Sequence, residues 1–124
     1  MIRYFEKNRI LSIIITLSLA VFIFYMSSRT FPGIGKKGFL SYVYHFSVFF
    51  AFAGFFLISV MRGKLKSELF LFVIALSIAY GVSDEYHQLF VPGRYADVLD
   101  VLTDSVGVLS ASIIYGVRCR ERMI

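Results

Sequence analysis

Residues 10–26 read ILSIIITLSLAVFIFYM, and this stretch decides the fold. Its most polar members are two serines and one threonine, and it lies between Arg9 and Arg29. At ~1.5 Å per residue a helix of this length is just able to cross the hydrocarbon layer of a bilayer. The stretch therefore predicts a transmembrane helix near the start of the chain.

The composition of the whole chain agrees with a membrane protein. Of its 124 residues, 58% are apolar and 17% are charged, whereas about a quarter of the residues in soluble domains are charged. The net charge of +5 comes from short basic clusters between apolar runs, a pattern of membrane flanks that argues against nucleic-acid binding. A single cysteine, Cys119, excludes an intrachain disulfide, and we expect no role for it.

Three further apolar runs follow, separated by stretches that contain glycine, proline or basic residues. We expect an all-α membrane protein with four transmembrane helices in a single domain, residues 1–124. The expected helices cover approximately residues 10–28, 39–61, 68–90 and 97–117. A loop at Phe31–Gly38 and a turn at Pro92–Gly93 are predicted to end two of these helices.

The distribution of basic residues predicts the direction of the spans. Nine lysines and arginines flank the spans on the side of the two termini, against four on the other side, which are Arg29, Lys36, Lys37 and Arg94. The positive-inside rule then places both termini in the cytoplasm and the Pro92–Gly93 turn outside. We expect a multi-pass protein of the cell membrane, with the lipid bilayer as its surroundings.

Several polar residues lie at one depth within these spans. At ~1.5 Å per residue, His45, Asp84 and Asp104 all lie roughly 9–11 Å below the outer ends of their helices. On the last helix Asp100 shares a face with Asp104, and Gly107 and Ala111 continue that face inward. Small residues at such positions permit close approach of membrane helices, so we expect this face to contact protein.

The charge balance of this outer region is strongly acidic. Five carboxylates, those of Asp84, Glu85, Asp97, Asp100 and Asp104, stand against one arginine and two histidines. Buried ionisable groups are costly in a membrane and mark function more often than in soluble cores. Shared protons, a protonated histidine or a bound divalent cation would each relieve the imbalance.

Simpler roles exist for some of these residues. Asp97, directly after the turn, is well placed to cap the last helix. For His87, near the surface, the simpler role is a solvated side chain, and for Gln88 it is an amide that bridges helices. The whole cluster could also be a structural latch between the last two helices.

The stretch DEYHQLFVPGR at residues 84–94, followed by Asp100, Asp104 and Gly107, resembles the VanZ-like family of small bacterial integral membrane proteins. The resembling pattern is Glu-x-x-Gln, an aromatic residue, a Pro-Gly-Arg turn, and then Asp-x-x-x-Asn/Asp-x-x-Gly on the next helix. His45 is similar to the histidine at the start of the family's second helix.

This resemblance implies a polar signature and a phenotype. The signature falls on His45, Glu85, Gln88, Arg94, Asp100 and Asp104. Two positions depart from the pattern: Asp104 stands where many members carry Asn, and Phe49 where a Tyr often follows the histidine. The founding members of the family are associated with resistance to the glycopeptide antibiotic teicoplanin, which is a phenotype and not a mechanism.

Four functions remain open on the sequence. The leading hypothesis is an outward-facing acidic pocket that binds an envelope lipid or a glycopeptide ligand through the six signature residues. A second is a metal-dependent enzyme acting on a lipid or isoprenoid phosphate head group, with Glu85, Asp100, Asp104 and His45 as candidate metal ligands. A third is proton-coupled transport, and the last is the structural latch.

Overall fold

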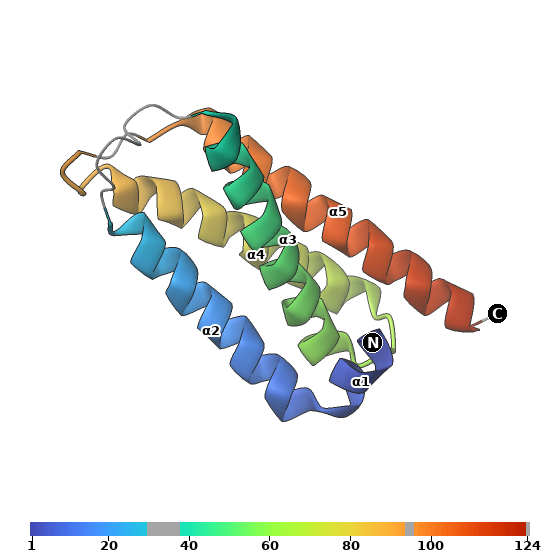
Figure 1. The fold of residues 1–124 in the computed structure, drawn as a ribbon. Coiled ribbons are helices and arrows are strands. Elements are labelled where there is room, and N and C mark those ends of the chain that lie inside the picture. Colours follow the sequence, from blue (N-terminus) through green and yellow to red (C-terminus); the bar gives the residue numbers. More distant parts are fainter. Residues whose placement is uncertain (30–37, 94–95, 124) are drawn as a thin grey trace.

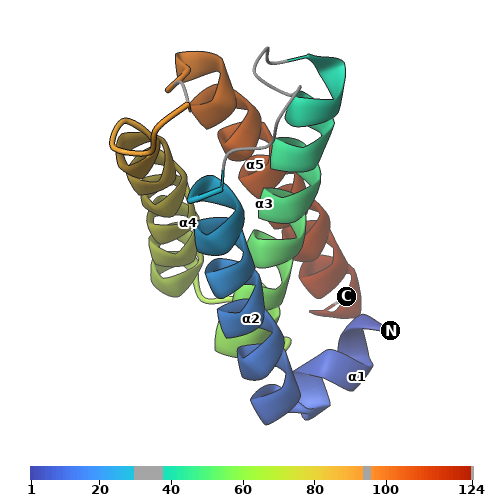
Figure 2. The same ribbon diagram turned by 60° about the vertical axis from the view of Figure 1, so that its left-hand side comes forward.

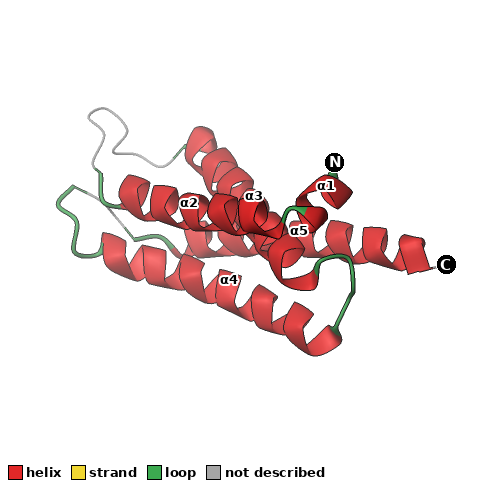
Figure 3. Cartoon of the chain, turned by 90° about the horizontal axis from the view of Figure 1, so that it is seen from below, coloured by secondary structure: helices red, strands yellow, loops and turns green. Residues whose placement is uncertain are grey.

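The computed structural model describes residues 1–29, 38–93 and 96–123, and all regular structure within them is helical (Figure 3). Four long helices form a bundle, preceded by a short helix (Figure 1). Their bounds are α1 (Ile2–Lys7), α2 (Arg9–Ser27), α3 (Phe39–Met61), α4 (Ser67–Gln88) and α5 (Val98–Met123). The all-α prediction is thereby confirmed.

Each of the four long helices can cross a membrane. Their apolar windows have mean hydropathies of 2.4 for α2, 1.9 for α3, and 1.5 for both α4 and α5. Many large apolar side chains point outward, among them Phe22, Leu71 and Ile113. Lipid is the solvent in which such a surface is favourable, so the four predicted spans are confirmed by length and composition.

Helix α3 holds the bundle together, because it contacts all four other helices (Figure 2). Its most extensive packing is against α5. One apolar core, which includes Phe49, Phe52 and Val108, lies between these two helices, and a second, around Leu57 and Tyr115, lies nearer the chain termini. Both termini are at the same end of the bundle (Figure 2), as an even number of spans requires.

The turns follow the expected chemistry where they are described. Helix α3 ends at a left-handed Arg62 (φ 53°) followed by Gly63 (φ 86°), which reverses the chain without a β-carbon clash at the glycine. Pro92 and Gly93 form a turn after α4, with Gly93 at φ 81°. Of the predicted loop at Phe31–Gly38, only Gly38 lies within the described residues, where it precedes the first residue of α3.

Two features of the helices differ from the expectation. The last helix continues to Met123, beyond the predicted end at residue 117, because neither glycine nor proline interrupts its basic final turns. The six-residue helix α1 was not predicted. It is too short to show helical periodicity, and contacts with α2 and α3 hold it in place.

Candidate functional site

The candidate site lies at the end of the bundle opposite the termini, and its centre is the ring of His45 on α3. His45 Nδ1 is 2.8 Å from Oδ1 of Asp104 on α5. A carboxylate oxygen can only accept, so Nδ1–H donates this hydrogen bond. The two residues were placed at one depth by the sequence, and here they are in direct contact.

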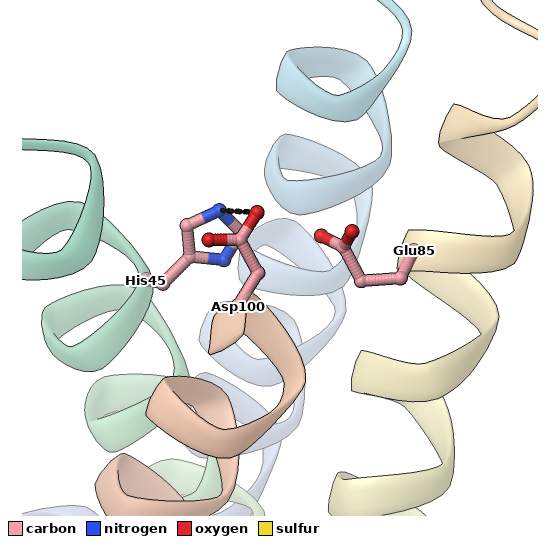
Figure 4. A group of neighbouring side chains, drawn as sticks. All are labelled: His45, Glu85 and Asp100. Atoms are coloured by element: carbon pink, nitrogen blue, oxygen red, sulfur yellow. Dashed lines mark ion pairs between the residues drawn. The ribbon is translucent and has the colours of Figure 1, made fainter. Parts of the chain in front are cut away.

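Asp100 lies on the other side of the same ring (Figure 4). Its Oδ2 is 3.6 Å from His45 Nε2. Asp100 and Asp104 are four residues apart on α5, so they project from one face of the helix. The two carboxylates of α5 therefore lie next to the two nitrogens of a single imidazole.

Glu85 completes the group from α4. Figure 4 shows its carboxylate turned toward Asp100 and His45. One ligand atom from each of His45, Glu85 and Asp100 can be chosen so that all three lie within 4.8 Å of one another. His45 is 3% exposed, Glu85 5%, and both Asp100 and Asp104 0%, so three helices bring four ionisable side chains together in the protein interior.

Asp97 positions this group from the start of α5. Its Oδ1 accepts a hydrogen bond of 2.9 Å from the backbone N–H of Leu99, which is the capping role that the sequence favoured. Its own backbone N–H donates to Glu85 Oε2 at 2.8 Å. The end of α4 and the beginning of α5 are thus joined through the Glu85 carboxylate.

Two glycines make room for the cluster. A β-carbon on Gly107 would lie 2.6 Å from the carbonyl oxygen of Phe46, so α5 and α3 touch backbone to backbone here. A β-carbon on Gly81 would lie 3.0 Å from Asp104 Oδ2, so α4 presents a bare backbone to that carboxylate. Close helix approach at the face of Gly107 was predicted, and it is confirmed.

The other two signature residues have different outcomes. Gln88 lies one helical turn beyond Glu85 on α4 and is buried, and its Oε1 receives no hydrogen bond from the described residues. Arg94 lies outside the described residues. Phe49, which replaces the tyrosine of the family pattern, is buried and packs beside Tyr80, with ring centroids 6.3 Å apart.

His87, on the neighbouring stripe of α4, faces α2 instead of the cluster. His87 Nε2 is 2.9 Å from Ser28 Oγ, and the His87 ring stacks on Phe24 with centroids 4.7 Å apart. The backbone oxygen of Asp84 accepts a hydrogen bond of 3.4 Å from Ser27 Oγ. His87 therefore has partners in the protein, and the reading of a merely solvated side chain is wrong.

A second polar group, at the opposite end, was missed by the sequence reasoning. Arg122 of α5 donates two hydrogen bonds to Glu6 of α1, from Nη1 to Oε2 at 2.6 Å and from Nη2 to Oε1 at 2.7 Å. Tyr115 donates a third to Glu6 Oε1 at 3.1 Å. The Arg122 hydrogen bonds hold the pKa of Glu6 below its ordinary value, against the opposing effect of burial. The only signal in the sequence was one acid among N-terminal basic residues.

The arrangement of the first group can hold a cation. Its donors are one imidazole nitrogen and carboxylate oxygens from two helices, and Asp104 binds the nitrogen that faces away from Asp100. Metal sites in proteins commonly have a carboxylate behind a histidine ligand in this way. Asp104, one of the four candidate metal ligands, thus supports the histidine instead of joining the three convergent donors.

Comparison with known proteins places this chain in a family. The family model VanZ/LLP1 matches residues 4–118, which include every residue of the cluster. No curated protein and no solved structure matches the chain. Since the match covers nearly the whole chain, the protein belongs to the VanZ/LLP1 family.

Proposed function

We propose that this membrane protein binds a polar or cationic ligand where His45, Glu85, Asp100 and Asp104 meet, and that this end of the bundle faces the outside of a bacterial cytoplasmic membrane. The orientation follows from the excess of lysine and arginine at the end that carries the termini. The ligand would then come from the cell envelope or from the outer lipid surface.

One observation carries the proposal: four ionisable side chains from three helices converge in the interior of a membrane bundle. Such groups are expensive in this environment, and helix packing alone does not require them. Apolar packing of α3 against α5 already forms a core beside the cluster. A binding role explains why a chain of this size keeps so many carboxylates together.

The roles of the residues follow from their chemistry. Glu85, Asp100 and Asp104 would supply negative charge, while His45 and Gln88 would orient the ligand by hydrogen bonds. Arg94 would hold a phosphate or balance the acids. The resulting phenotype would be altered handling of envelope lipids or of glycopeptide antibiotics such as teicoplanin, which is the resistance associated with founding members of the family.

Susceptibility of a host strain tests this proposal. In a host where the parent protein raises resistance to teicoplanin, we expect Glu85→Gln and Arg94→Ala to abolish the effect at equal expression. Glu68→Gln is the matched control, because it makes the same chemical change on the same helix. Glu68 is exposed and lies at the opposite end of α4. Equal resistance of the parent and all three variants would contradict the proposal.

Two alternatives give different results. If the cluster is only a latch, every cluster variant will lose expression to the same degree and none will lose activity selectively. Proton transport is supported less well, because the buried carboxylates and histidine of the described residues lie at the two ends of the bundle. The buried polar side chains between them are mainly hydroxyls, such as those of Ser59, Ser77 and Ser112.

A further inference from the structure

We infer that the ligand of this cluster is a single divalent transition-metal ion, with Zn²⁺ as the best fit, bound by His45 Nε2, Asp100 and Glu85. The inference rests on the proposed function, because it names the ligand class of the same site. It is carried by the geometry of the histidine, by the burial of the donors and by the hydrogen bonds that hold two of them.

The hydrogen bond to Asp104 determines which nitrogen is available to a metal. Nδ1–H donates to Asp104 Oδ1 at 2.8 Å, so in the neutral ring the lone pair belongs to Nε2. Nε2 faces Asp100 at 3.6 Å, which is longer than a good hydrogen bond. The ring is therefore held by one carboxylate and presents a metal-binding nitrogen toward another.

The spacing of the donors matches an ion. Ligands about 2.1 Å from Zn²⁺ in a tetrahedron lie about 3.4 Å from one another. The separation of 3.6 Å between His45 Nε2 and Asp100 Oδ2 is already close to this value. One ligand atom from each of His45, Glu85 and Asp100 lies within 4.8 Å of the other two, so Glu85 is near enough to supply the third ligand.

The surroundings of the donors also point to an ion. Glu85 is held by the backbone N–H of Asp97, as ligating carboxylates commonly are. Asp104 is completely buried and contacts His45 through one oxygen, while its Oδ2 receives no hydrogen bond from the described residues. This buried oxygen adds negative charge beside the ring, which a cation bound at Nε2 would help to balance.

The donor set selects among metals. Mg²⁺ and Ca²⁺ prefer all-oxygen shells, whereas an imidazole nitrogen with carboxylates suits Zn²⁺ and its neighbours in the first transition row. The tight burial of the four side chains favours a bare ion over a bulky organic group. Three protein donors would leave a fourth position for water or for a phosphate-bearing ligand.

Calorimetry with Zn²⁺ alone tests the inference on the full chain, purified in detergent without a histidine tag and stripped by a chelator. We expect one Zn²⁺ per chain in the parent and in the exposed-acid control Glu68→Gln. We expect His45→Ala, Asp100→Asn and Glu85→Gln each to weaken binding by at least about tenfold. A folded, helical parent that takes up no Zn²⁺, or equal uptake by all the variants, would overturn the inference.

Asp104 acts as a positioning residue, and its test separates orientation from charge. Asp104→Asn keeps an oxygen that can accept the Nδ1–H bond, so we expect a loss of less than about tenfold. Asp104→Leu removes the acceptor, and we expect a loss of about 10–100-fold. If the two variants bind Zn²⁺ equally, Asp104 does not orient the ring.

X-ray absorption of the zinc-loaded parent needs no variant and so does not depend on whether the variants fold. We expect one imidazole nitrogen with oxygen ligands at about 2.0–2.2 Å, and a sulfur ligand or several imidazoles would overturn the assignment. Failure here is separable from failure of the proposed function. If Zn²⁺ does not bind but Glu85→Gln still lowers resistance, only the metal is wrong. If Zn²⁺ binds but resistance is independent of the cluster, only the resistance role is wrong.

Discussion

The two ends of the bundle solve the problem of buried charge in different ways. At the end that carries the termini, the Glu6 carboxylate receives two hydrogen bonds from Arg122 and one from Tyr115. At the opposite end, one oxygen of Asp104 accepts a hydrogen bond from His45, while the other receives no hydrogen bond from the described residues. The first end is a completed ion pair, and the second has unused binding capacity.

This difference indicates which of the two polar groups is structural. The Glu6 group links the first and last helices of the chain, and its hydrogen bonds satisfy both carboxylate oxygens. Such a group stabilises the fold without needing a ligand. Beside His45, Asp104 Oδ2 and Gln88 Oε1 receive no hydrogen bond from the described residues, as expected of a site that keeps polar atoms for a ligand. Substitutions at the two ends should therefore have opposite consequences.

The largest effect is expected from Gly107→Ala, which separates the helices that carry the cluster. Its β-carbon would lie 2.6 Å from the carbonyl oxygen of Phe46, and a backbone atom cannot turn aside. We expect a loss of about 2–3 kcal/mol in the free energy of unfolding, measured by denaturant titration in micelles. Gly54→Ala is the control, because its nearest neighbour would be 4.0 Å away. Equal stability of the two variants would contradict the close approach.

Breaking the ion pair at the other end should have the next largest effect. Glu6→Gln removes a carboxylate that accepts charge-assisted hydrogen bonds from Arg122, and we expect a cost of about 1–3 kcal/mol. A double-mutant cycle with Arg122→Gln measures the coupling between the two side chains. If the two single substitutions lower the free energy of unfolding additively, the interaction between Glu6 and Arg122 does not stabilise the protein.

The same pair predicts a dependence of stability on pH. Because the Arg122 hydrogen bonds lower the pKa of Glu6 in the folded protein, its contribution is full above the ordinary carboxyl pKa. The contribution is lost as the pH falls through the folded pKa of Glu6. We expect the parent and Glu6→Gln to differ in melting temperature at pH 7 and to converge in strong acid. A difference that grows on acidification would contradict this sign.

A smaller effect on stability is expected from Asp104→Asn. The substitution removes a charge from a fully buried side chain and keeps an acceptor for the Nδ1–H of His45. We expect the free energy of unfolding to change by less than about 1 kcal/mol or to rise, whereas affinity for the ligand of the site falls. If Asp104→Asn destabilises the protein as much as Glu6→Gln does, the cluster is structural and the comparison between the two ends fails.

The smallest effect is expected from Gly81→Ala. Its β-carbon would lie 3.0 Å from Asp104 Oδ2 and 3.2 Å from Asp104 Cβ, so the carboxylate must turn and α5 must move by a few tenths of an ångström. We expect a cost of at most about 1 kcal/mol together with a fewfold loss of Zn²⁺ affinity. Gly116→Ala, whose nearest contact would be a Phe70 ring atom at 3.6 Å, should leave Zn²⁺ affinity unchanged. Equal Zn²⁺ affinities of the two variants would contradict a role for Gly81 in placing Asp104.

Much of the fold was predictable because membrane spans are long and apolar. Depth along a helix is a simple function of residue number, so the meeting of His45 with Asp104 could be anticipated. The capping role of Asp97 and the close contact at Gly107 followed from equally local rules. These features need only the rise and periodicity of a helix.

Other features depend on side-chain orientation or on distant pairing, which those rules do not supply. Nothing in the sequence indicated that Asp104 binds Nδ1 of His45 while Asp100 faces Nε2. The pairing of Glu6 with Arg122 joins residues 116 positions apart, through a helix too short to be recognised. That His87 faces away from Glu85 could be known only from the position of α2, whose Phe24 ring stacks on His87.

Anomalous diffraction at the zinc absorption edge, from crystals of the zinc-loaded full chain, tests the central claim most directly. We predict one peak between α3, α4 and α5, at about 2.0–2.2 Å from His45 Nε2 and from oxygens of Asp100 and Glu85, with Asp104 still bound to Nδ1. A folded chain whose map has no peak there, or whose Glu85 points away from Asp100, would contradict the account.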